Sequence, residues 1–215
     1  MELIQCIYLV SLVFAICSGV YRYRVLDMAA KIFCIYLSYT FVAECLATYA
    51  AERFHNNMSV YAIYNLGEVV FMAMYFNYSI DLFKKLHIGV YIAGAGIIVG
   101  ACDIIFVEGP YSMDAYFMFF EGFCIIGMCL FSFFRLLIKQ EPIKLTRYPH
   151  FWITAVVLLY RTITYIYWGL YNVFSVKLSK DIMILNRSIV VLNIMCYCVI
   201  GLVYLLYSRM QEEHE

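Results

Sequence analysis

The chain has 215 residues, of which 65% are hydrophobic and only 14% are charged, with fifteen Lys and Arg balanced by fifteen Asp and Glu. The mean hydropathy is +0.82, so the chain has too few polar side chains to cover a water-soluble globule. This composition excludes a soluble domain and predicts an integral membrane protein in contact with a lipid bilayer. The basic residues are dispersed rather than grouped on one surface, which argues against nucleic-acid binding.

Seven segments are apolar over about the 20 residues that a helix needs to cross the hydrocarbon core. They cover residues 3–20, 32–51, 60–80, 88–107, 115–138, 150–171 and 182–207. Small side chains recur in the fourth segment and predict close helix packing there; they are Gly89, Gly94, Gly96 and Gly100. We therefore predict a single all-α domain, residues 1–215, built as a seven-transmembrane-helix bundle.

The basic residues also predict the orientation, because cytoplasmic connectors carry an excess of Lys and Arg. Ten of the fifteen lie in connectors on one side: Arg22, Arg24, Lys31, Lys84, Lys85, Arg135, Lys139, Lys144, Arg147 and Arg209. We expect the N-terminus outside, the C-terminus in the cytoplasm and a multi-pass location in a cell membrane, with a bacterial inner membrane as the expected one. The first segment is expected to stay as a helix, because Glu2 replaces the basic start of a cleaved signal peptide.

Six ionisable side chains fall inside the predicted spans: Glu44, Glu68, Asp103, Glu121, Arg161 and Arg187. An ionised side chain at the bilayer centre costs about 2.5–3.5 kcal/mol on insertion scales, so such residues usually face other helices and mark a ligand or ion path. Counting about 1.5 Å per residue places all six in the outer half of the membrane. Asp103 lies nearest the surface and is expected to reach water. The others are expected to line one pocket or, alternatively, to form ion pairs that only fix helix order.

Polar residues recur along three predicted helices at helical spacing, which places each set on one face. The stripes are Asn57, Tyr61, Tyr64, Asn65 and Glu68; Thr154, Arg161, Tyr165 and Trp168; and Asn186, Asn193 and Tyr197, with Arg187 beside them. The predicted ligand-binding residues are Glu44, Tyr61, Tyr64, Asn65, Glu68, Glu121, Arg161, Tyr165, Asn186, Arg187 and Asn193. They are expected to form a polar pocket in the outer half of the bundle.

The cysteines and histidines give no sign of a metal or redox site. All nine cysteines lie within predicted spans and no Cys-x-x-Cys occurs, so they are interpreted as small apolar packing residues. The four histidines are scattered at helix ends or in connectors. We predict no metal, no cofactor and no catalytic residue.

One stretch carries a family resemblance. His55–Glu68 combines the pair Asn56-Asn57 with the spaced aromatics Tyr61 and Tyr64 and ends on Glu68. It resembles a signature of short seven-helix bacterial membrane proteins of uncharacterised function, which are similar in plan to the membrane sensor modules of signalling kinases. The resemblance implies a sensor and transfers no activity.

These observations predict a sensor or ligand-binding module. It would recognise a small polar or amphipathic ligand in the outer pocket and signal through a cytoplasmic protein partner. The first alternative is a small transporter or proton-coupled permease in which Glu68 or Glu44 changes protonation. The second is an intramembrane enzyme acting on lipid, with Glu68 or Glu121 as general acid or base.

Overall fold

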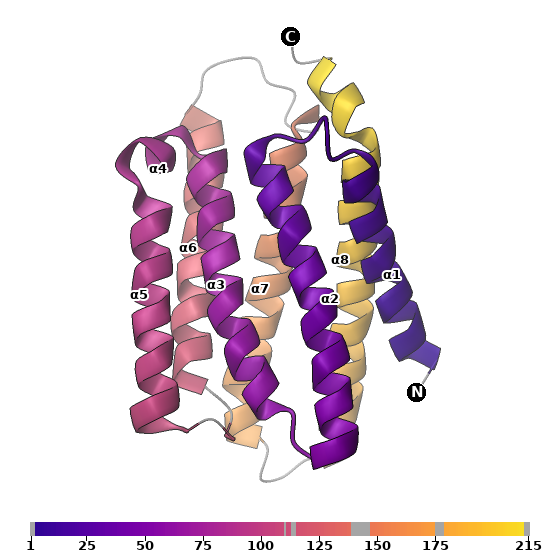
Figure 1. Cartoon of the computed structure of the whole chain (residues 1–215), viewed down its shortest axis with the longest axis vertical. Helices are drawn as coiled ribbons and strands as arrows, with labels where there is room; N and C mark the ends of the chain where they lie inside the picture. The colour runs from indigo at the N-terminus through magenta and orange to yellow at the C-terminus, as the bar shows by residue number, and fades with distance from the viewer. Residues whose placement is uncertain (1–2, 110, 113–114, 139–146, 175–178, 213–215) are drawn as a thin grey trace. The chain divides into compact units, whose positions relative to one another are not determined.

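The computed structural model describes residues 3–109, 111–112, 115–138, 147–174 and 179–212, and it gives side chains for these residues except 168–186 and 211–212. Every regular element in these ranges is a helix (Figure 1). In chain order the elements are α1 (Leu3–Tyr21), α2 (Met28–Phe54), α3 (Met58–Ser79), α4 (Asp81–Leu86), α5 (Ile88–Cys102), the π-helical turn η1 (Asp103–Val107), α6 (Ala115–Ile138), α7 (Pro149–Phe174) and α8 (Ser179–Glu212).

The all-α prediction is confirmed, and each of the seven predicted segments coincides with a helix to within a few residues. The fourth segment is α5 followed by η1, and the short helix α4 was not predicted from the sequence. Among the described residues, six helices are long and apolar enough to cross a membrane: α1, α2, α3, α5 with η1, α6 and the Arg187–Met210 part of α8. The chain is therefore a multi-pass membrane protein.

The remaining long helix, α7, has 26 residues but is not among these six spans. Arg161 and the hydroxyl groups of several Thr and Tyr residues lower the mean hydropathy of the part of α7 whose side chains the structure describes, residues 149–167. The count of seven spans and the orientation of the chain stay predictions.

Polar residues set several helix boundaries. The Asp27 side chain caps α2 by accepting a hydrogen bond of 2.8 Å from the backbone N–H of Ala30. His55 and His87 both have φ of 54°, a left-handed conformation that is uncommon for a residue other than glycine, and they end α2 and α4. His55 and His87 therefore lie in the turns that end these helices, in agreement with their predicted place in connectors.

The chain divides into two compact units, each of which is described by itself. The first, here called the α2–α6 unit, covers Leu26–Arg135, and the second, the α1/α7/α8 unit, combines Met1–Val25 with Leu136–Glu215. The predicted organisation as a single domain stays a prediction.

In the α2–α6 unit, α3 packs against both α2 and α5. Glycines allow the close approach of α5: Gly96 faces Val69 of α3, and a Cβ at position 96 would lie 2.8 Å from the Val69 side chain. Gly89 donates its backbone N–H to the buried Asn77 Oδ1 at 3.2 Å. The glycine-rich fourth segment therefore packs as predicted, except that Gly94 faces open space.

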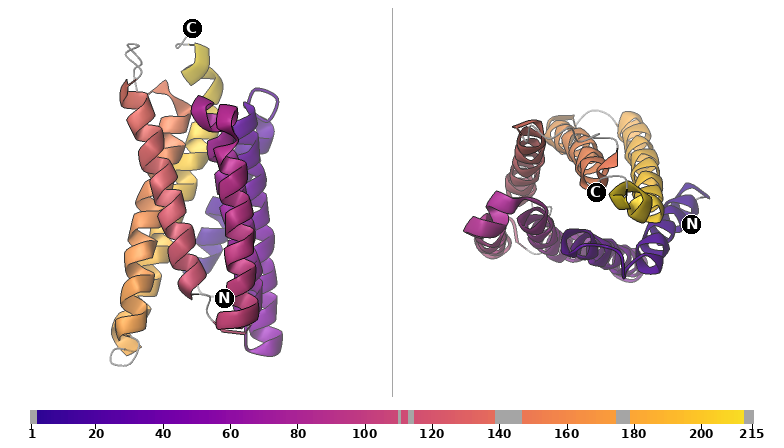
Figure 2. Two further views of the ribbon diagram at one scale, coloured as in Figure 1. Left: turned by 90° about the vertical axis from the view of Figure 1, so that its left-hand side faces the viewer. Right: turned by 90° about the horizontal axis from the view of Figure 1, so that it is seen from above.

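In the α1/α7/α8 unit, α8 packs against both α1 and α7. The Tyr8 ring of α1 lies 5.8 Å from the Tyr197 ring, and further along the same two helices Phe14 lies over Gly201, so α1 runs parallel to α8 (Figure 2). His150 at the start of α7 lies 6.4 Å from the Tyr207 ring near the end of α8, so these two helices are antiparallel.

Candidate functional site

A line of hydrogen-bonded side chains connects α2 and α3 at mid-length. Glu68 lies ten residues after the start of α3, about 15 Å along the helix axis, and is 3% exposed. The Tyr36 hydroxyl donates a hydrogen bond to Glu68 Oε1. The same hydroxyl lies 3.0 Å from the Tyr64 hydroxyl, which in turn lies 3.4 Å from Thr40 Oγ1. We call these four residues the hydroxyl chain.

Tyr39 supports this chain from the side. Its ring stacks on the Tyr64 ring, with 5.6 Å between centroids and 14° between planes, and its hydroxyl donates to the Ile63 carbonyl oxygen at 2.9 Å. The ring lies directly over Gly67, where a Cβ would overlap it. The absence of a side chain at position 67 therefore allows Tyr39 to lie against the α3 backbone and hold Tyr64 in place.

The hydroxyl chain can carry its hydrogen bonds in two directions. An ionised carboxylate only accepts, so Tyr36 donates to Glu68, whereas a protonated carboxyl group can also donate. Either oxygen can be the donor in the Tyr36–Tyr64 pair and in the Thr40–Tyr64 pair. The Thr40 hydroxyl also donates to the Tyr36 carbonyl oxygen at 3.0 Å. A change of charge at Glu68 can therefore reverse the hydrogen bonds between Glu68 and Tyr36 and between Tyr36 and Tyr64.

The sequence predicted two members of this cluster, Tyr64 and Glu68, and missed Tyr36, Tyr39 and Thr40. A signal for the missed residues was present, because Tyr36, Thr40 and the predicted Glu44 are spaced by four residues and share one face of α2. The polar stripes recognised in the sequence lie on three other helices, so this face of α2 was not among them.

The other predicted ligand-binding residues of the α2–α6 unit differ in how deeply they are buried. Asn65 is 7% exposed and Glu121 of α6 is 1% exposed, so both are buried polar residues. Glu44 and Tyr61 are half-buried. Their joint participation in a pocket stays a prediction.

The predicted residues that carry positive charge belong to the α1/α7/α8 unit. Arg161 is half-buried, and its guanidinium carbon lies 5.9 Å from the Tyr160 ring centroid. Arg187 is exposed, whereas Tyr165 and Asn193 are half-buried. Asn186 lies in α8, and its side chain is outside the described residues. Because the acidic and basic residues belong to separate units, the common polar pocket stays a prediction.

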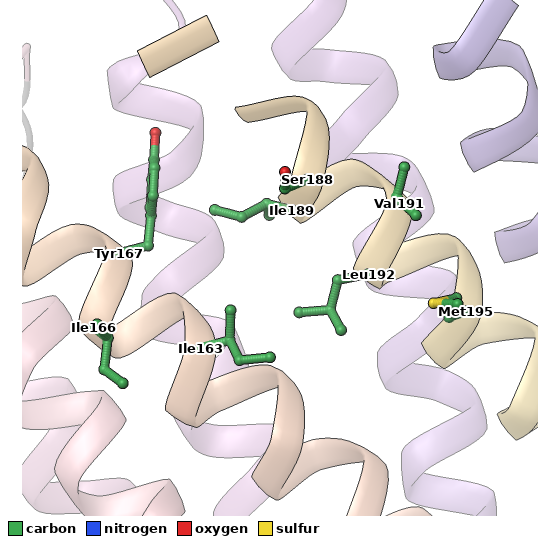
Figure 3. Close-up of a pocket in the computed structure, with 8 residues that line it drawn as sticks. All are labelled: Ile163, Ile166, Tyr167, Ser188, Ile189, Val191, Leu192 and Met195. Carbon is green, nitrogen blue, oxygen red and sulfur yellow. The ribbon is translucent and has the colours of Figure 1, made fainter. Parts of the chain in front are cut away.

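A groove of about 380 Å³ lies between α7 and α8 (Figure 3). It is lined by Ile163, Ile166 and Tyr167 from α7 and by Ser188, Ile189, Val191, Leu192 and Met195 from α8. Its volume falls within the range of about 300–1,000 Å³ for small-molecule sites. The lining is mainly aliphatic and includes none of the predicted ligand-binding residues, so this groove differs in chemistry from the polar pocket that the sequence predicted.

Asp103 corrects one expectation from the sequence. It was expected to reach water near the surface, but it is 4% exposed. Its Oδ2 atom accepts a hydrogen bond of 3.4 Å from the backbone N–H of Phe117 in the first turn of α6. The free N–H groups at a helix start attract a carboxylate, and this interaction holds Asp103 inside the protein.

Glu108 lies just beyond the candidate span Ile88–Val107 and forms a pair with Asp103. Burial, the charge of Asp103 and a hydrogen bond between the two side chains raise the pKa of Glu108, while hydrogen bonds from the backbone N–H groups of Ala115 and Tyr116 act in the opposite direction. The Glu108 carboxyl group therefore keeps its proton to a higher pH than an ordinary glutamate does.

Among the described residues, no group of three or more His, Cys, Asp or Glu side chains is placed to hold a metal ion. All nine cysteines are free thiols, and Cys34, Cys129 and Cys196 are buried.

Comparisons with known proteins give no match: no protein-family model, no curated protein and no solved structure matches the chain. The resemblance of the His55–Glu68 stretch to seven-helix bacterial membrane proteins therefore rests on that stretch alone. The structure and composition together identify a helical, multi-pass membrane protein with six candidate spans among its described residues.

Proposed function

We propose that the chain is a membrane sensor or ligand-binding module in which the α2–α3 pair responds to the ligand. The hydroxyl chain that ends on the buried Glu68 carries this proposal. Placing a carboxyl group at mid-span is costly, and such residues generally mark ligand or ion sites. A carboxylate beside several tyrosine rings suits a positively charged group, which both the charge and the ring faces attract. The proposed ligand is a small polar or amphipathic molecule with a cationic group.

The proposal includes seven spans, with α7 as the seventh. Its 26 residues extend about 39 Å, more than the roughly 30 Å of the hydrocarbon core. In this arrangement the N-terminus is outside, and the basic connectors and the C-terminus are cytoplasmic. These connectors would contact the cytoplasmic signalling partner.

The response would begin at Glu68. A cation bound to the Glu68 carboxylate competes with the Tyr36 hydroxyl for that carboxylate. When Tyr36 no longer donates to Glu68, its hydroxyl can donate to the Tyr64 hydroxyl instead. Because these residues join α2 to α3, the two helices would then favour a different packing. A ligand that binds one packing more tightly shifts the equilibrium toward it.

A proton-coupled permease is the second candidate, and the reversible hydroxyl chain favours it. Ionisable side chains inside membrane spans, as Glu68 is here, form the proton relays of pumps and transporters. In that case Glu68 would gain and lose a proton during each transport cycle.

Two measurements on the purified protein distinguish these functions. The first is the shift in melting temperature caused by tetramethylammonium chloride, with sodium chloride at equal ionic strength as the reference. A sensor is expected to be stabilised by the organic cation, and Glu68→Gln is expected to abolish the shift. Tyr91→Phe is the matched control, because Tyr91 is 73% exposed on α5.

The second measurement is the decay of a pH step in liposomes that contain a pH-sensitive dye. A sensor leaves the decay equal to that of empty liposomes. Faster decay that Glu68→Gln removes would establish the permease instead. If the cation gives no stabilisation and the pH decay is unchanged, Glu68 only holds α2 to α3 and the proposed site is wrong.

A further inference from the structure

We propose that arginines at one end of the α1/α7/α8 unit bind the phosphate group of an anionic membrane lipid. Arg22 and Arg24, which follow α1, and Arg209, near the end of α8, form this arginine surface. The surface lies in a different unit from the hydroxyl chain. Lipid binding there does not depend on the function proposed for Glu68 and requires only that the protein spans a membrane.

Helix packing brings Arg22 and Arg209 to the same level. Phe14 of α1 lies over Gly201 of α8, and the two helices run parallel. Arg22 lies eight residues after Phe14. Arg209 likewise lies eight residues after Gly201, so both arginines lie about 12 Å further along their helices. The backbone N–H of Arg22 donates to the Ser18 carbonyl oxygen at 3.2 Å, which extends the helical geometry of α1 to this residue. The ends of α1 and α8 accordingly lie on the same side in Figure 1.

The α1/α7/α8 unit has a one-sided charge. Among the side chains that the structure describes in this unit, six are arginine and none is lysine, aspartate or glutamate. Arg24 and Arg209 are exposed. Arg22 is half-buried, and its Nε atom has no hydrogen-bond partner among the described residues. Because like charges repel and no described carboxylate of the unit neutralises them, the arginine surface attracts an anion from outside the unit.

The end of α1 sets the depth of this surface in the membrane. The candidate span Leu3–Tyr21 ends one residue before Arg22, where the helix itself ends. Tyr21 is 76% and Tyr23 is 40% exposed, and tyrosine rings gather at the level of the lipid headgroups. Arg22, and Arg209 at the same level, therefore lie in the headgroup layer. The anions of that layer are lipid phosphates, which identifies the occupant.

The guanidinium group suits this occupant. Arginine presents several N–H donors in a planar arrangement that matches two phosphate oxygens. The phosphate of phosphatidylglycerol keeps its net charge, whereas the choline group of phosphatidylcholine neutralises the phosphate beside it. Each basic residue near a membrane surface corresponds to about a five-fold preference for anionic lipid. The arginine surface should therefore select phosphatidylglycerol.

Native mass spectrometry of the full chain tests the proposal. The purified protein is equilibrated with equal amounts of phosphatidylglycerol and phosphatidylcholine, and the lipids that it retains are counted. The test variant is Arg22→Gln/Arg209→Gln. Lys84→Gln/Lys85→Gln is the matched control, because it removes the same charge from two exposed positions of α4 in the other unit. Both variants should melt near the temperature of the unchanged protein.

The unchanged protein is expected to retain phosphatidylglycerol in preference to phosphatidylcholine. Arg22→Gln/Arg209→Gln should lower this preference by about five-fold for each arginine replaced, and the lysine control should keep it. An unchanged protein without preference would overturn the proposal. So would an equal loss in the two variants, because any positive charge would then have the same effect.

Two other anions are tested as occupants. Replacing the glutamates that follow Arg209 in the sequence, as Glu212→Gln/Glu213→Gln/Glu215→Gln, should leave the preference unchanged; a rise would show that the chain's own carboxylates occupy the arginines. Fluorescein-labelled deca-glutamate should not bind the protein in phosphatidylglycerol nanodiscs. Binding that Arg22→Gln/Arg209→Gln abolishes would assign the surface to an acidic protein segment. Either of these results would overturn the lipid site.

Discussion

The described contacts between helices differ in kind between the two units. In the α2–α6 unit, polar side chains cross from one helix to the next, as Tyr36 does to Glu68 and Asn77 to the backbone of Gly89. In the α1/α7/α8 unit, the described contacts between helices include rings packed on rings and the Phe14 ring packed on Gly201. In the same unit, the Thr164 hydroxyl donates a hydrogen bond to the carbonyl oxygen of Tyr160 in its own helix.

This difference matters because hydrophobic burial does not hold helices together in lipid, where the surroundings are as apolar as the side chains. Close packing and hydrogen bonds between helices remain. A hydrogen bond has direction and depends on protonation, so the α2–α6 unit has a means of responding to charge. Apolar packing has neither property, and in the α1/α7/α8 unit it leaves the mainly aliphatic groove between α7 and α8.

The largest expected effect comes from breaking close packing in one unit alone. Gly67→Ala places a methyl group in the Tyr39 ring, and overpacking of this kind costs about 1–3 kcal/mol. We expect local loosening of the α2–α6 unit. It can be measured as faster alkylation of the buried Cys34 by N-ethylmaleimide, with Cys196 of the other unit as the internal reference. Peptide mass spectrometry separates the two sites.

Two variants sharpen this test. Gly94→Ala is the control within the same unit, because a Cβ there would meet nothing within 4 Å, and it should leave both alkylation rates unchanged. Gly201→Ala overlaps the Phe14 ring of α1 and should accelerate Cys196 first. If Gly67→Ala and Gly201→Ala accelerate both cysteines equally, the two units loosen together and the comparison between them fails.

A smaller effect on stability is expected from the removal of one hydroxyl group. Tyr36→Phe keeps the ring and removes the hydrogen bonds to Glu68 and Tyr64. Hydrogen bonds between membrane helices contribute about 0.6 kcal/mol on average, and a bond to a carboxylate should lie at the upper end of the measured range, near 1.7 kcal/mol. Thermal unfolding should show a lower melting temperature for Tyr36→Phe than for the exposed control Tyr91→Phe.

The double variant Tyr36→Phe/Glu68→Gln identifies the source of that effect. If the hydroxyl acts through the carboxylate, the destabilisation by the two substitutions together should be smaller than the sum of the single effects. Additive effects would show that Tyr36 stabilises the helix pair without Glu68.

Much of the fold could be predicted from the sequence because a membrane helix is specified by length and hydropathy. The segment 115–138 matches α6 at both ends. The same reasoning missed α4, whose six residues are too few for a hydropathy pattern. It also missed the π-helical turn at Asp103–Val107, since the change in hydrogen bonding there leaves no mark on hydropathy.

The candidate site was predictable only in part. Charge inside an apolar span singled out Glu68, and helical spacing added Tyr64. The partners of Glu68 depend on which helix lies beside α3 and in what register, and hydropathy does not specify either. Asp103 shows the opposite error: its position near a helix end suggested exposure to water, but the backbone N–H of Phe117 offers its carboxylate a hydrogen-bond donor within the protein.

The smallest effect is expected at the Asp103–Glu108 pair, which tests whether the polar character of the α2–α6 unit extends to its surface. The pKa of Glu108 is raised in the folded protein, first by burial and then by Asp103, so the folded state binds this proton more tightly than the unfolded state. The contribution of this bound proton to stability is complete below the ordinary glutamate pKa of 4.5 and is lost as the pH rises through the raised pKa of Glu108.

The melting temperature of the unchanged protein should therefore fall as the pH rises from 4.5 through the raised pKa of Glu108. It should fall less in Glu108→Gln, whose amide stays neutral. Glu52→Gln, at an exposed position of α2, should keep the pH dependence of the unchanged protein. An equal slope in all three proteins would mean that the pKa of Glu108 is not raised in the folded protein, and the response to charge would then be confined to the hydroxyl chain.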